Sequence, residues 1–95
     1  MPQDEFVIRP EPAPPASPDR RHGHKRVWSQ LLANNVRYFR QRKNITQEAL
    51  AEQCGIYRTY MSRIETGRCN PSLTVMVALA VALDVQPYAL LVPID

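Results

Sequence analysis

Residues 46–67 read TQEALAEQCGIYRTYMSRIETG, and this stretch decides the fold. Thr46 can accept hydrogen bonds from the free amides at a helix start, and the apolar residues after it recur at helical spacing. Gly55 tolerates a positive φ angle and can end that helix in a tight turn. A second short helix is then predicted over residues 57–66 and ends at Gly67. The pattern predicts two short helices joined by a glycine turn.

The residues at the crossing of these two helices fit a helix-turn-helix motif. The first helix must carry a small side chain where the second one crosses it, and Ala51 lies at that place. Both helices must also supply apolar groups to a shared core, and the available groups are Leu50, Cys54, Ile56, Met61 and Ile64. A random pair of amphipathic helices rarely meets all of these requirements. We therefore predict an all-α domain built around this motif.

Further helices are predicted on both sides of the motif. A first helix over residues 28–43 follows from an apolar stripe at helical spacing, made of Trp28, Leu32, Val36 and Phe39. Ser72 is the predicted cap of a fourth helix that continues to Leu83, and residues 87–91 form a last short turn. The eleven nearly all apolar residues of this fourth helix are far fewer than the roughly 20 that a membrane span needs. We expect no membrane association.

Basic residues outnumber acidic residues in the middle of the sequence, between Arg37 and Arg68. Residues 37–68 contain seven Lys/Arg against three Asp/Glu, whereas residues 69–95 contain two acids and no base. A one-sided basic face is typical of proteins with a polyanionic partner, and a solvated basic surface without a partner is the alternative.

Catalytic and metal-binding patterns are not found in this sequence. The two cysteines and two histidines lack metal-ligand spacing, and there is no carboxylate pair, nucleophile–base set or phosphate loop. We therefore expect no metal, no cofactor and no enzymatic activity. The start is acidic and proline-rich rather than a signal peptide, which favours a cytoplasmic protein with both thiols free.

Several segments resemble the phage-repressor-like, Cro-type helix-turn-helix domains. They are VRYFR at 36–40, TQEALA at 46–51, RTYMSRIETG at 58–67, NPSL at 70–73 and LAVALDV at 79–85. The resemblance covers about residues 31–91 and implies five helices, a bundle-like core and usually a symmetric dimer on a palindromic site in double-stranded DNA. The run RTYMS at 58–62 also looks like restriction–modification controller proteins.

The resemblance also implies roles for single residues, with 57–66 as the helix that reads the major groove. The positions that match base contacts are Arg58, Thr59 and Arg63. Arginine suits O6 and N7 of guanine, although solvated helix charges are the alternative for both arginines. The positions that match backbone contacts or bracing of the reading helix are Thr46, Gln47, Tyr57, Ser62 and Thr66. Arg40 and Glu65 match a partly buried, structural ion pair between the first and third helices.

Two features depart from the family pattern. Tyr57 stands where a short capping side chain is more usual, so we expect a loss of about 1 kcal/mol of cap energy. A contact of the ring with a phosphate or a thymine methyl group is the expected compensation. The outer face of the fourth helix is apolar where relatives carry charges, which predicts a homodimer. The predicted interface residues are Thr74, Val77, Ala78, Val81 and Tyr88. The alternative is a helix that is buried against the N-terminal segment.

The N-terminal 26 residues are predicted to form a disordered extension, and residues 27–95 the folded domain. Six of the nine prolines lie in residues 1–18, which lack the apolar periodicity needed to offset ordering. Residues 20–26 follow as a basic run, either an arm along DNA phosphate or a solvated linker. The proline-rich start is also available to a protein partner.

These observations favour a small transcriptional regulator that binds a specific DNA sequence, as a repressor, a controller or an antitoxin-like autoregulator. The alternative is a protein–protein adaptor that keeps the fold and docks its partner on the apolar fourth helix. Outward-facing arginines at 58 and 63 favour the DNA-binding function.

Overall fold

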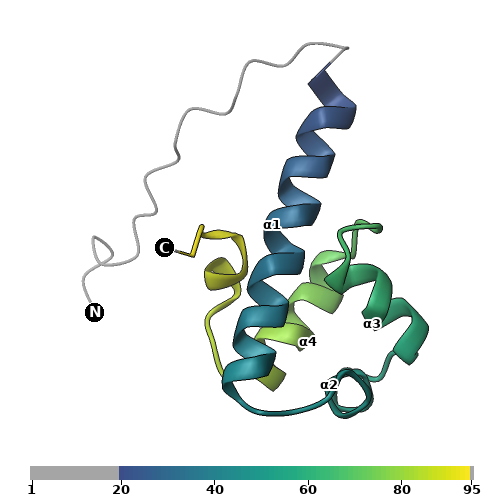
Figure 1. Ribbon diagram of the computed structural model, residues 1–95, viewed down its shortest axis with the longest axis vertical. Helices are drawn as coiled ribbons and strands as arrows, with labels where there is room; N and C mark the ends of the chain where they lie inside the picture. Colours follow the sequence, from purple (N-terminus) through teal and green to yellow (C-terminus); the bar gives the residue numbers. More distant parts are fainter. Residues whose placement is uncertain (1–19, 95) are drawn as a thin grey trace.

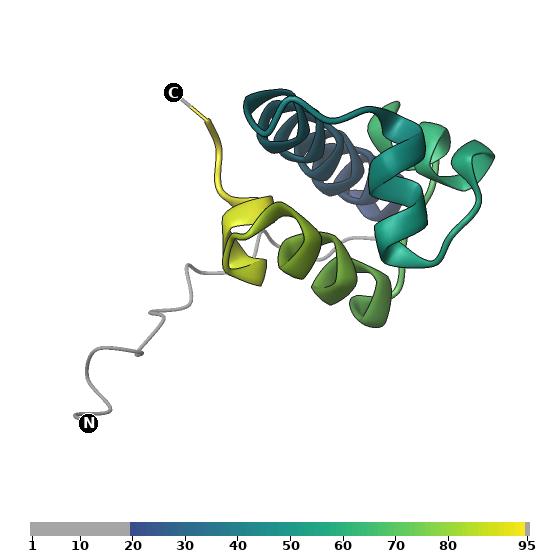
Figure 2. The same cartoon turned by 90° about the horizontal axis from the view of Figure 1, so that it is seen from below.

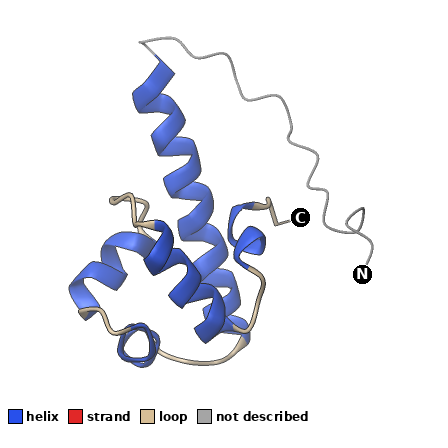
Figure 3. Cartoon of the chain, turned by 180° about the vertical axis from the view of Figure 1, so that it is seen from behind, coloured by secondary structure: helices blue, strands red, loops and turns tan. Residues whose placement is uncertain are grey.

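A computed structural model describes residues 20–94, with side chains from residue 27 onward. Its elements are α1 (Arg20–Arg42), α2 (Gln47–Cys54), α3 (Arg58–Glu65), α4 (Leu73–Leu83) and the 3₁₀ helix η2 (Pro87–Leu91). The described part of the chain contains no strand, which confirms the all-α prediction (Figure 3). The predicted fifth helix is a 3₁₀ helix of five residues rather than an α-helix. In so short a segment, hydrogen bonds between residues three apart pair more of the backbone groups than bonds between residues four apart.

The helix α1 is longer than the sequence pattern predicts. It begins at Arg20, eight residues before the predicted start at Trp28, and projects beyond the rest of the bundle (Figure 1). The basic run 20–26, which we assigned to a disordered extension, is therefore helical and that assignment was wrong. Arginine and lysine favour helix and no proline interrupts the run, so the packed turns of α1 extend outward through it. Residues 1–19, predicted to be disordered, lie outside the described residues.

The turn between α2 and α3 forms as the sequence predicts. Thr46 precedes α2 in extended backbone, and its hydroxyl accepts a hydrogen bond from the Ala49 amide at 3.0 Å. Gly55 ends the helix at φ 70°, and the amide of Ile56 then donates to the Ala51 carbonyl at 3.0 Å. This glycine turn brings the chain directly into α3, so that the two short helices pack across each other.

Replacing Gly55 with alanine is expected to lower the free energy of unfolding by about 1–2 kcal/mol. A Cβ atom there would meet no heavy atom within 4 Å, so the whole cost comes from the left-handed backbone. Gly55→Asn should cost less, because asparagine visits this conformation more readily. Chemical denaturation followed by circular dichroism measures both, and equal losses would assign the effect to something other than φ.

Figure 2 shows the helices arranged around a common centre, and a single core contains residues from every one of them. Its buried apolar side chains are Leu32, Val36, Leu50, Ala51, Met61, Ile64, Leu79, Ala80, Leu83 and Leu90. Trp28 was predicted to share this apolar stripe but is 42% exposed, and it lies toward the N-terminal, projecting end of α1. None of the described helices combines the length and apolar character that a membrane crossing requires.

A buried asparagine fastens the C-terminal segment to α1. The Asn35 side chain is fully buried, and its Nδ2 donates to the carbonyls of Leu90 at 2.7 Å and Val92 at 3.0 Å. This role could not be predicted from sequence, because an asparagine inside an apolar stripe gives no sign of a partner 55 residues away.

Candidate nucleic-acid interface

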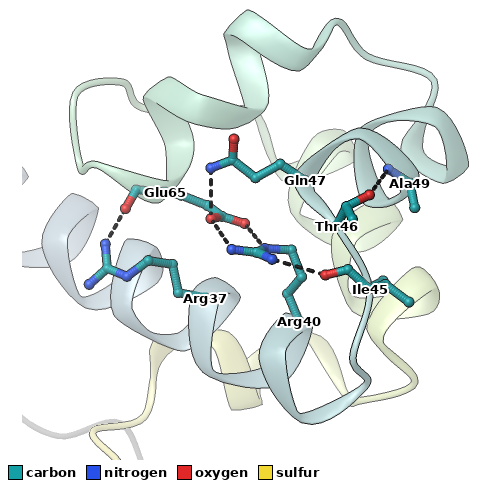
Figure 4. Close-up of polar contacts among 7 residues, drawn as sticks. All are labelled: Arg37, Arg40, Ile45, Thr46, Gln47, Ala49 and Glu65. Atoms are coloured by element: carbon teal, nitrogen blue, oxygen red, sulfur yellow. Dashed lines mark hydrogen bonds and ion pairs between the residues drawn. The ribbon is translucent and has the colours of Figure 1, made fainter.

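The C-terminal end of α3 is held by an ion pair with α1. Arg40 Nε lies 2.6 Å from Glu65 Oε2, and its Nη2 donates to Glu65 Oε1 at 3.0 Å (Figure 4). The Glu65 side chain is 1% exposed and that of Arg40 is 15% exposed. The structure thus brings the two predicted partners together in a two-bonded geometry that only a planar guanidinium can provide.

Three further contacts surround this ion pair, and two of them reach α3. Gln47 at the start of α2 donates from Nε2 to Glu65 Oε1 at 2.9 Å (Figure 4). Arg37 donates from Nη1 to the Glu65 backbone carbonyl, where a positive charge suits the helix dipole. Arg40 Nη1 also reaches the Ile45 carbonyl at 2.9 Å. The orientation of α3 is therefore fixed by α1 and α2 together. Gln47 braces α3, and its contact with DNA stays a prediction.

The opposite side of α3 is exposed. All three residues predicted to contact bases, Arg58, Thr59 and Arg63, have exposed side chains. In contrast, Met61, Ile64 and Glu65 of the same helix are buried. Because one side of this eight-residue helix is packed in the core, the exposed side chains on its other side project from a backbone whose position is fixed.

Arg58 has a partner that sequence analysis missed. Its Nε lies 3.4 Å from Glu48 Oε2, and both side chains remain largely exposed, at 60% and 67%. The two residues lie on different helices, so that no periodicity in the sequence links them. An exposed pair of this kind is weak, so the Arg58 guanidinium remains available to other acceptors.

Arg63 lies beside a small neutral cluster. Burial raises the pKa of the Cys69 thiol, and the Arg63 charge and a hydrogen bond from Tyr60 partly oppose this shift. Burial likewise raises the pKa of the Tyr60 hydroxyl, and the Arg63 charge again lowers it in part. Both groups therefore stay neutral near pH 7 and leave the positive charge of Arg63 uncompensated by them. Within the described residues, no group of three or more His, Cys, Asp or Glu side chains is placed to hold a metal ion.

Comparison with known proteins identifies the family of this helical domain. The family described as "Helix-turn-helix domain" matches residues 31–91. This chain belongs to that family. The fold is similar to that in the crystal structure of the hypothetical transcription factor NHTF from Neisseria, with 43% identity and a TM-score of 0.69 over 73% of this chain and 78% of that one.

Other relatives point to the same class. The Neisseria hypothetical transcription factor from Neisseria meningitidis is 48% identical over 66% of this chain, and the match spans 59% of its own length. The control protein C.SmaI from Serratia marcescens is 40% identical over 65% of this chain and 74% of its own. The restriction-modification controller protein C.AhdI from Aeromonas hydrophila is 35% identical over 65% of this chain and 94% of that one, with a TM-score of 0.63.

The other residues predicted to contact the DNA backbone or to brace α3 differ in their hydrogen bonds and in their exposure to solvent. Thr46 uses its hydroxyl to cap α2. Thr66 donates back to the Ser62 and Arg63 carbonyls at 2.9 and 3.2 Å, so its hydroxyl stabilises the end of α3. Ser62 is half-buried. Tyr57 is 84% exposed and makes no capping hydrogen bond. Contacts of these residues with DNA stay predictions.

The outer face of α4 carries exposed apolar side chains. Val81 is 74% exposed, Val77 40%, and Leu73, which the sequence analysis did not include, 71%. Thr74 beside them is exposed and Ala78 is half-buried. Tyr88, which was predicted to join this face, lines a cavity of about 270 Å³ between α1 and the C-terminal segment, with Tyr38, Phe39 and Ile94 among its neighbours.

Proposed function

We propose that this chain binds a specific sequence in double-stranded DNA through the exposed side of α3 and regulates transcription as a repressor, controller or autoregulator. The observation that carries the proposal is the division of α3 into two sides. Glu65 and the apolar residues are clamped inward, whereas Arg58, Thr59 and Arg63 face outward from the same eight-residue helix. A rigid helix with outward arginines suits direct reading of guanine in the major groove.

The start of α2 is proposed to hold the DNA backbone. Thr46 and the first amides of α2 form the positive end of an eight-residue helix, which attracts a phosphate. Gln47 connects this end to Glu65, so a phosphate bound there would be in fixed register with α3. DNA as the partner also implies a cytoplasmic site of action.

Selection of bound duplexes from a random pool tests the proposal directly. The expected result is a recurring motif that contains guanine and two inverted half-sites. A double variant, Arg58→Ala with Arg63→Ala, should retain the fold and lose the motif. If the unmodified chain enriches no sequence, the adaptor alternative, with a protein docked on α4, replaces DNA binding.

We further propose that the chain acts as a homodimer through the outer face of α4. Leu73, Val77 and Val81 leave an apolar stripe in water, and a second copy would cover it symmetrically. A two-fold pair of α3 helices would then read a palindromic site.

Val81→Glu is expected to weaken this dimer at least tenfold, because two charges would enter an apolar interface. Sedimentation equilibrium measures the dissociation constant, and Gln41→Glu, at an exposed position of α1, is the matched control. A wild-type chain that stays monomeric at high micromolar concentration, or equal constants for the two variants, would rule out the α4 interface.

A further inference from the structure

Tyr57 occupies the cap position of α3 without capping it. The hydroxyls of Thr46 and Ser72 accept amide hydrogen bonds at the starts of α2 and α4, at 3.0 and 3.2 Å. Tyr57 makes no such bond, and its 84% exposure is the highest among the exposed large apolar residues described. A serine or threonine here would stabilise the helix, so the fold itself gives no reason for this tyrosine.

The backbone on both sides of Tyr57 is fixed. Before it, the Ile56 amide donates to the Ala51 carbonyl at 3.0 Å; after it, the Met61 amide donates to the Tyr57 carbonyl at 3.0 Å. Tyr57 itself is extended, at φ −72° and ψ 149°. The ring therefore leaves the protein from a defined point at the first turn of α3, next to Arg58.

We propose that the ring of Tyr57 reads a thymine by packing on its 5-methyl group, beside the guanine that Arg58 contacts. This inference rests on the proposed function, because it requires the start of α3 to enter the major groove. The methyl group of thymine is the apolar feature that base edges present in that groove. A tyrosine ring offers a large apolar surface at a low cost in conformational entropy, since only two side-chain torsions are fixed.

Single deoxyuridine substitutions test this contact, because they remove only the methyl group. On the selected operator, the wild-type chain should lose about three- to fivefold in affinity at one thymine per half-site, the effect of exposing one methyl group. Tyr57→Phe should show the same loss, since the ring is retained. Tyr57→Ser should bind thymine and deoxyuridine equally, about 10- to 25-fold more weakly than the wild type, because the variant loses the contact in both half-sites of a dimer.

Tyr57→Ser also separates recognition from folding. Serine supplies the missing cap, so the melting temperature should rise while the affinity falls. Equal weakening of Tyr57→Phe on thymine and deoxyuridine DNA would assign the hydroxyl to a phosphate and overturn the proposal. So would a deoxyuridine effect that persists in Tyr57→Ser. Failure of the proposed function itself looks different, because the wild-type chain would then select no operator in which thymine could be replaced.

Discussion

Glu65→Ala is expected to lower the free energy of unfolding by about 3–5 kcal/mol, because it leaves the largely buried guanidinium of Arg40 without a counter-charge. The same change removes the acceptor of Gln47 Nε2, so a second, partly buried donor loses its partner. In a domain of this size each kcal/mol shifts the melting temperature by roughly 4–8 °C. The variant should therefore melt at least about 12 °C below the wild type in a scan followed by circular dichroism.

Two control variants show whether the loss comes from the ion pair. Glu52→Ala removes an exposed carboxylate of α2 and should change the free energy of unfolding by less than about 0.5 kcal/mol. Arg40→Lys keeps the charge but cannot form both hydrogen bonds to Glu65, so its loss should lie between the other two. If Glu65→Ala were as mild as Glu52→Ala, the pair would not hold α3 in place.

Local chemistry explains which elements could be predicted from sequence. Thr46, Gly55 and Ser72 each act within four residues of the chain, so their roles at helix ends follow from residue type and position. The start of α1 lies in a polar, basic run that has no apolar stripe. An apolar stripe locates only the packed part of such a helix, which is why the predicted start at Trp28 fell short.

The site was predictable to the extent that it repeats a known pattern. The partnership of Arg40 with Glu65 came from family resemblance, because 25 residues separate the two in sequence. The pair between Glu48 and Arg58 is not part of that pattern and depends on how α2 crosses α3. Asn35 illustrates the same limit, since its partners are backbone carbonyls, which no side-chain pattern marks.

Arg63→Ala is expected to weaken binding to the selected operator by about 1–3 kcal/mol per half-site, and therefore at least 30-fold for a dimer. The loss should fall on a single base position of each half-site, where all four bases then become nearly equivalent. The physical reason is that a guanidinium bonded to O6 and N7 of guanine has no equally good partner on the other bases. Binding measured by fluorescence anisotropy on a set of single-base operator variants gives the profile.

Arg68→Ala is the matched control, because it removes the same charge from an exposed position in the loop after α3. Loss of charge alone weakens binding to all sequences alike and lowers the salt dependence of the affinity. Arg63→Ala should differ from Arg68→Ala by its effect on one position of the operator. A uniform loss for Arg63→Ala, with a reduced salt slope and an unchanged base profile, would instead place Arg63 on the phosphate backbone. The ion pair between Arg40 and Glu65 would then still hold α3 in place, but Arg58 and Thr59 would have to contact the bases without Arg63.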